Sequence, residues 1–83
     1  MKKVTEAEIY DKLTQLFKEI FMRDDLELSP ALTAKDVPGW DSFKQIEIII
    51  ATEEIFKIKL RIREIEALYN VGDLVKAILL KTD

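Results

Sequence analysis

Near the start of the chain, apolar residues recur at steps of three and four, which places them on one face of a helix. This face predicts a first amphipathic helix over Glu6–Met22. Thr5 precedes the helix and Glu8 lies three residues further on, a spacing typical of a capping box. The residues of the face are Ile9, Leu13, Leu16, Phe17 and Ile20.

The segment 24–41 has no dominant period and reads as a long connection between two helices. Because long structureless loops are uncommon in compact domains, we expect it to be ordered and to place single apolar side chains in the core. The stretch 29–32, with its proline, predicts a short helical turn. The isolated apolar residues of this segment are Leu26, Leu28, Leu32 and Val37.

The segment Ser42–Phe56 predicts a second helix that carries two apolar stripes. One stripe consists of Ile48, Ile49, Thr52 and Phe56, with Gln45 at its edge. The opposite stripe consists of Phe43, Ile46 and Ile50, accompanied by Glu47 and Glu54. A helix of a small bundle needs one apolar face, so we expect the first stripe in the core and the second as an exposed interaction surface. Alternatively, the long connection covers the second stripe.

Residues 57–63 alternate basic and apolar side chains, and without a second strand to pair with they predict an extended linker. A short helix is expected over Glu64–Tyr69. Asn70 then precedes a last helix as its N-cap, with Asp73 at the third position. The buried stripe of this helix is predicted to be Val71, Leu74, Val75, Ile78 and Leu79.

Together these segments predict an all-α fold in a single domain over residues 1–83. The expected architecture is a small four-helix bundle, with three main helices, a short third helix, and a long loop between the first and second.

The amino-acid composition disfavours several classes of function. The 83 residues include no histidine and no cysteine, which removes the commonest general base, the commonest metal ligand and any thiolate nucleophile. We therefore predict neither an enzyme nor a metal site. The net charge of −3 comes from interleaved acidic and basic residues, which disfavours nucleic acid as a partner. No run approaches the ~20 apolar residues of a membrane span, so we expect a cytoplasmic monomer with no membrane contact.

A candidate site lies where Pro38-Gly39 ends the connection and the second helix begins. The Ser42 hydroxyl is expected in solvent at this helix start, where free N–H groups and the positive dipole end favour a phosphate. Asp41 offers carboxylate oxygens that suit the Mg²⁺ of a visiting enzyme. Because no histidine can act as its base, Ser42 suits modification by another enzyme better than catalysis. Alternatively, Asp41 and Ser42 only cap the helix, with Gln45 at capping-box spacing from Ser42.

The stretch Gly39-Trp40-Asp41-Ser42-Phe43, followed by Glu47 and by Glu53-Glu54-Ile55-Phe56, resembles the attachment region of acyl carrier proteins. Thr5–Ile20 resembles the first helix of that family, and Asn70–Val75 resembles the start of its last helix, so nearly the whole chain is covered. The resemblance implies a 4′-phosphopantetheine arm on Ser42, attached by a separate phosphopantetheinyl transferase whose metal Asp41 assists. The thiol of the arm would carry an acyl group as a thioester.

The same resemblance implies a partner-binding face and the partners that it serves. These are the transferase and acyl-loading and acyl-using enzymes of the ligase, ketosynthase or acyltransferase type. Lys44 and the modest net charge depart from housekeeping fatty-acid carriers, and favour a discrete, specialised carrier of a fatty-acid, polyketide or surface-polymer pathway. The residues implied in partner binding are Phe43, Lys44, Ile46, Glu47, Ile50, Glu53 and Glu54.

Two alternatives remain open on the sequence. One is a peptidyl or aminoacyl carrier, which uses the same serine. The other is an unmodified helical interaction domain that binds partners through Phe43, Ile46 and Ile50.

Overall fold

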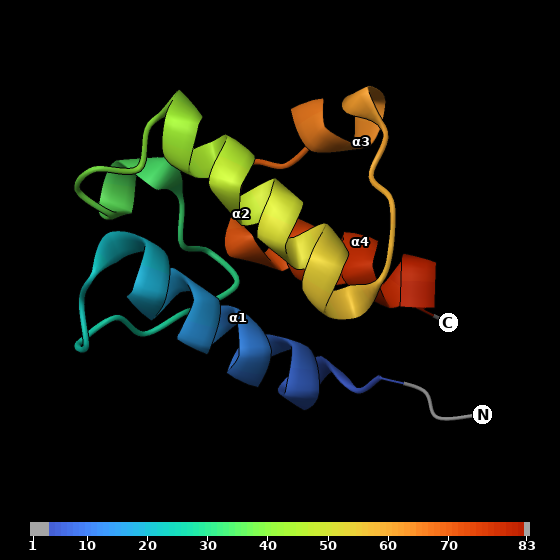
Figure 1. The fold of residues 1–83 in the computed structure, drawn as a ribbon, viewed down its shortest axis with the longest axis horizontal. Coiled ribbons are helices and arrows are strands. Elements are labelled where there is room, and N and C mark those ends of the chain that lie inside the picture. The colour runs from blue at the N-terminus through green and yellow to red at the C-terminus, as the bar shows by residue number, and fades with distance from the viewer. Residues whose placement is uncertain (1–3, 83) are drawn as a thin grey trace.

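The computed structural model describes residues 4–82, and within this range it contains four α-helices, one short 3-10 helix and no strand. This confirms the predicted all-α class. Helix α1 contacts both α2 and α4, and α2 crosses in front of α4 in Figure 1. None of these helices has the length and apolar character needed to cross a membrane. The elements are α1 (Glu6–Phe21), η1 (Ala34–Asp36), α2 (Ser42–Phe56), α3 (Ile62–Glu66) and α4 (Val71–Thr82).

The core is a single cluster to which α1, α2 and α4 each contribute one face, as the apolar periods predict. Three residues predicted in these faces, Ile20, Phe56 and Leu79, are only partly buried and pack against its margin. The cluster consists of Ile9, Leu13, Leu16, Phe17, Ile48, Ile49, Ile58, Leu60, Val71, Leu74, Val75 and Ile78.

Helix α1 ends one residue earlier than predicted, because Met22 adopts a left-handed conformation with φ 53°. At its start, the Glu8 backbone N–H donates to Thr5 Oγ1 at 3.2 Å, which confirms Thr5 as the N-cap. The Glu8 carboxylate accepts from the Thr5 hydroxyl, so the reciprocal backbone bond of a capping box is replaced by a side-chain bond.

The long connection is ordered, and its apolar residues hold it against the bundle. Val37 is buried, while Leu26, Leu28 and Leu32 are partly buried against the core. The stretch 29–32 forms a turn closed by the Leu32 N–H on the Ser29 carbonyl at 3.1 Å. The helical segment of the connection is η1, which begins later than the predicted turn. At its start, Thr33 N–H donates to Asp36 Oδ2 at 2.9 Å.

Two carbonyls of this connection satisfy the first N–H groups of α4, which have no partner within the helix. Val71 N–H donates to Leu32 O and Gly72 N–H donates to Pro30 O, both at 2.9 Å. A Cβ on Gly72 would lie 3.0 Å from Pro30 O, so this close approach requires glycine. Asn70 Oδ1 accepts from Asp73 N–H at 2.8 Å, which confirms Asn70 as a cap.

Helix α3 covers Ile62–Glu66, so the predicted helix over Glu64–Tyr69 is displaced. It begins earlier because the Glu64 carboxylate accepts from Arg61 N–H at 2.9 Å. The same carboxylate lies 2.9 Å from Lys81 Nζ and thereby ties α3 to α4. The hydrogen bond from Lys81, together with that from Arg61, holds the pKa of Glu64 below its usual value. The contact with Lys81 links residues distant in sequence, and no local period reveals it.

The two faces of α2 predict that alanine at two adjacent positions lowers the stability of the fold by different amounts. Ile49 is 6% exposed and Ile50 is 51% exposed. Ile49→Ala should lower the free energy of unfolding by ~2–4 kcal/mol, because it leaves a cavity in the core. Ile50→Ala should change it by less than ~1 kcal/mol. Urea denaturation followed by circular dichroism measures both, and equal losses would contradict the assigned core face.

Candidate functional site

A tight turn leads the chain into α2. Trp40 N–H donates to Val37 O at 3.2 Å, which closes a turn with Pro38 and Gly39 at its centre. Gly39 has φ +89°, as the third position of a type II turn requires. Nothing lies within 4 Å of a Cβ built on Gly39, so its conformation rather than its size makes glycine necessary here. Because the Val37 side chain is buried, it anchors the start of the turn in the protein interior.

Asp41 is the N-cap of α2. Its Oδ1 accepts from Lys44 N–H at 3.0 Å, and its carbonyl accepts from Gln45 N–H at 2.9 Å. The alternative of a capping box between Ser42 and Gln45 is therefore wrong. Gln45 Oε1 instead accepts from Trp40 Nε1 at 2.8 Å. The helix start is thus capped without the Ser42 hydroxyl.

Ser42 is the first residue of α2 and is exposed. Backbone N–H groups in the first turn of a helix have no intrahelical partner, and the dipole there is positive. A phosphate joined to the Ser42 hydroxyl would therefore lie at the end of the helix that stabilises a negative charge. Since Asp41 already accepts from Lys44 N–H, the feature that fits a phosphodiester on Ser42 is the positive dipole end of α2.

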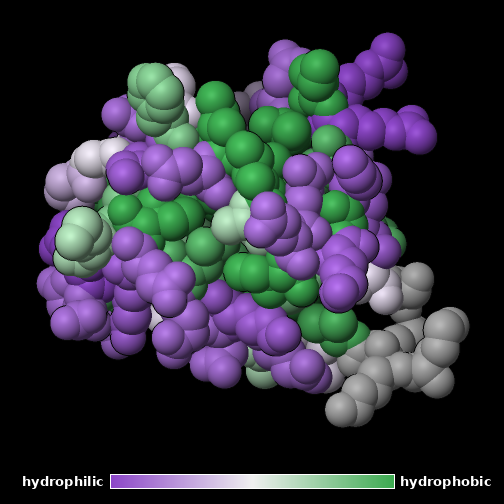
Figure 2. All heavy atoms as spheres, in the orientation of Figure 1, coloured by the Kyte–Doolittle hydropathy of each residue, from purple (hydrophilic) through white to green (hydrophobic). Residues whose placement is uncertain are grey.

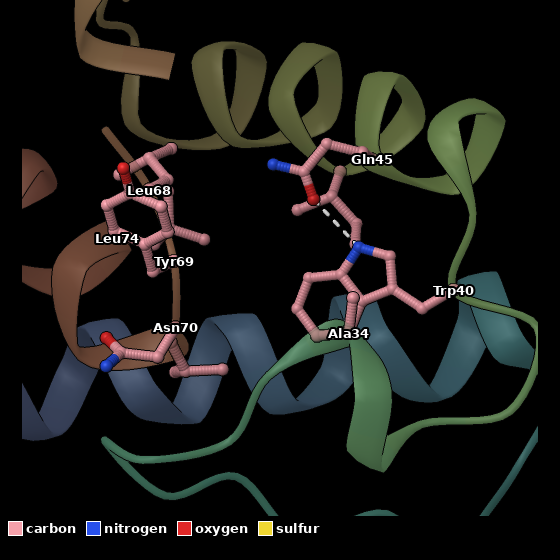
Figure 3. Close-up of a pocket in the computed structure, with 9 residues that line it drawn as sticks. Ala34, Trp40, Gln45, Leu68, Tyr69, Asn70 and Leu74 are labelled. Carbon is pink, nitrogen blue, oxygen red and sulfur yellow. Dashed lines mark hydrogen bonds between the residues drawn. The ribbon is translucent and has the colours of Figure 1, made fainter. Parts of the chain in front are cut away.

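An open groove runs beside Ser42. Ile46 of α2, Ile65 of α3 and Leu68 line it together with Trp40 and the serine itself. Next to it lies a partly open cavity of about 50 Å³. Figure 3 shows the hydrogen-bonded Trp40–Gln45 pair on one side of this cavity and Leu68, Asn70 and Leu74 on the other.

Trp40 is held in place by two aromatic rings of α1. Its ring meets Phe17 edge-on, with centroids 5.3 Å apart and an angle of 84°. Phe21 lies at 5.9 Å with a tilt of 51°. Such arrangements favour aromatic pairs beyond the area that they bury. The sequence indicated neither these ring contacts, which join distant segments, nor the bond to Gln45, because side-chain bonds of this kind leave no mark in a helical period.

The second apolar stripe of α2 is exposed. Phe43, Ile46 and Ile50 are 78%, 56% and 51% exposed, which excludes the alternative in which the connection covers them. Hydrophobic side chains gather over α2 and toward α3 in Figure 2. Beside this stripe, Lys44 Nζ lies 3.7 Å from Glu47 Oε1.

The two acidic residues near the end of α2 differ in their surroundings. Glu54 is exposed, like the apolar stripe. Glu53 is half-buried, and its Oε2 accepts from Leu60 N–H at 2.8 Å. This bond secures the linker after α2, so Glu53 has a structural partner within the chain.

The chain was compared with known proteins. No family model matches it. Meromycolate extension acyl carrier proteins of Mycobacterium leprae and Mycobacterium tuberculosis are 28% identical to it over 72 residues, which cover 87% of this chain. The matched region is 63% of the length of these relatives. The solution NMR structure of a holo acyl carrier protein from Geobacter metallireducens is 35% identical, with a TM-score of 0.82 over 87% of this chain and 83% of that one.

The capping geometry predicts different costs for two adjacent alanine substitutions. Asp41→Ala removes the side chain that caps α2 and should lower the free energy of unfolding by ~1 kcal/mol. Ser42→Ala removes an exposed hydroxyl that the cap does not use, and should change it by less than ~0.5 kcal/mol. Urea denaturation measures both values. A larger loss for Ser42→Ala than for Asp41→Ala would contradict the assignment of the cap.

Proposed function

This chain belongs to the acyl carrier protein family, and we propose that Ser42 carries a 4′-phosphopantetheine arm on which acyl groups are held as thioesters. The observation that carries the proposal is the exposed Ser42 hydroxyl at the N-terminus of α2, beside a cap made by Asp41. The likeness to a holo acyl carrier protein adds support. The chain spans 63% of the length of the curated relatives. We therefore infer its activity from its own site and not from the whole of those proteins.

The attachment step follows from the chemistry of the site. The Ser42 oxygen attacks the β-phosphorus of coenzyme A, the pyrophosphate bond breaks, and adenosine 3′,5′-bisphosphate leaves. The serine proton passes to the transferase or to water. Asp41, exposed beside the serine, is proposed to assist the metal of the transferase. When bound, the arm supplies the thiol that a chain without cysteine lacks.

In this proposal the 83 residues act as one carrier domain and perform no catalysis of their own. The transferase and the acyl-loading and acyl-using enzymes bind the exposed face of α2, and a cytoplasmic monomer remains our expectation. Glu53 supports this face indirectly, through its bond to Leu60. The proposed face consists of Phe43, Lys44, Ile46, Glu47, Ile50 and Glu54.

The proposed pathway is a specialised one. The Lys44–Glu47 pair places a positive charge in the first turn of α2 and offsets a carboxylate of the face. Partners matched to this surface would have a less basic docking patch than partners of strongly acidic carriers. A peptidyl or aminoacyl carrier is the second candidate, since it uses the same serine. The relatives named as acyl carriers favour acyl cargo.

The attachment proposal is tested by incubating the purified chain with coenzyme A, Mg²⁺ and a broad-specificity phosphopantetheinyl transferase. Intact-mass spectrometry should show the gain of one phosphopantetheine group in the wild-type chain. Ser42→Ala should show none, because it removes the accepting oxygen. A matched control is Ser29→Ala, which removes an exposed hydroxyl in the connection and should load normally. No gain in the wild type, or an equal gain in Ser42→Ala, would favour an unmodified interaction domain.

The exposed stripe of α2 is tested by placing a charge at its centre. Ile50→Asp should lower kcat/KM of the transferase for this chain roughly tenfold, the effect of losing ~1.4 kcal/mol of interface energy. The thermal unfolding midpoint should change little, because Ile50 is half exposed. Leu80→Asp, at a residue of α4 that is 80% exposed, is the control and should load at the wild-type rate. Equal loading of Ile50→Asp and wild type would remove Ile50 from the binding face.

A further inference from the structure

We propose that the Trp40–Gln45 hydrogen bond closes the interior of the bundle to long acyl chains, so that this carrier shelters only short acyl groups. The inference rests on the attachment at Ser42 proposed above. It concerns the space next to that serine, which is divided into an outer groove and an inner cavity.

The groove and the cavity share one wall. Four residues line both spaces, and Ser42 lines only the groove. An acyl chain that starts from Ser42 and enters the cavity by way of the groove therefore passes this wall. The hydrogen bond of 2.8 Å between Trp40 Nε1 and Gln45 Oε1 lies within the wall (Figure 3). The residues of the wall are Ala34, Trp40, Gln45 and Leu68.

The donor side chain, Trp40, and the acceptor side chain, Gln45, differ in their freedom to move. Trp40 is held between the turn at Gly39 and the rings of Phe17 and Phe21. Passage would therefore require the Gln45 side chain to swing away from Trp40. Both groups are half-buried, and an alkyl chain can replace neither the donor nor the acceptor. Opening the wall with an apolar cargo would therefore break this bond without replacing it from the cargo.

The cavity behind the wall is also small. Its volume of about 50 Å³ is roughly a third of the ~150 Å³ that accommodates benzene in an engineered apolar cavity. By the same comparison, roughly two carbon atoms fill such a space. A longer chain thus stays in the open groove, beside Ile46, Ile65 and Leu68, where partner enzymes can reach it.

The test loads Ser42 with acyl-phosphopantetheine from acetyl-, butanoyl- and octanoyl-coenzyme A, with intact mass confirming each product. Thermal unfolding and Trp40 emission are then measured, since Trp40 is the only tryptophan of the chain. In the wild type, the octanoyl form should unfold within ~1 °C of the acetyl form, with the same emission maximum. In Gln45→Ala, the octanoyl form should unfold roughly 4 °C or more above the acetyl form, because the chain now enters and stabilises the folded state. Its Trp40 emission should move to shorter wavelength.

Two further variants keep the test decisive. Trp40→Phe removes the donor but retains an aromatic ring, and it should show the same rise in midpoint as Gln45→Ala. Gln15→Ala, at an exposed glutamine of α1, is the matched control and should behave as the wild type. A wild-type midpoint that rises with chain length as steeply as that of Gln45→Ala would overturn the inference, as would flat midpoints in both wall variants. Failure of the wild type to load would overturn the proposed function and this inference together.

Discussion

The packing of Trp40 against Phe17 and Phe21 is the contact on which the candidate site depends. Trp40 stands between the turn at Gly39 and the cap at Asp41, so its position determines where α2 begins. The indole also donates to Gln45 in the second turn of α2 and thereby orients the helix relative to α1. A displacement of this ring would move the serine, the cap and the groove together.

The apolar residues of helix α2 lie on two faces, one buried and one exposed. Ile48, Ile49 and Thr52 are buried in the bundle, while Phe43, Ile46 and Ile50 remain exposed. A small domain buries a limited share of its surface, so large apolar side chains left exposed on one helix cost stability that the core could have used. That cost is understandable if a partner covers the stripe, as in the proposed carrier role. The bond of Glu53 to Leu60 ties the far end of this helix to the linker that follows it.

Local patterns predicted most of the fold, and specific side-chain hydrogen bonds and ion pairs account for what they missed. Helices α1, α2 and α4 are long enough for the period of the helix to appear, and their caps Thr5 and Asn70 lie at recognisable spacings. Helix α3 has five residues, too few for a period, and its bounds depend on bonds that Glu64 makes. In the same way, Gln45 stands at capping-box spacing from Ser42 but bonds to an indole positioned by α1. The exposed serine and the two-faced helix could be predicted, whereas the wall beside the serine could not.

The division between Asp41 and Ser42 explains how a serine that we propose to be modified can occupy a helix start. N-capping side chains satisfy backbone N–H groups, and a serine that served as the cap would have its oxygen engaged there. Here the carboxylate of Asp41 makes that bond and leaves the next hydroxyl in solvent. Ile46, one turn further along α2, lines the groove beside Ser42 and also belongs to the exposed stripe. Under the proposed attachment to Ser42, a partner docked on the stripe would therefore cover the edge of the groove beside the cargo. Docking and access to the cargo would then be coupled through one side chain, that of Ile46.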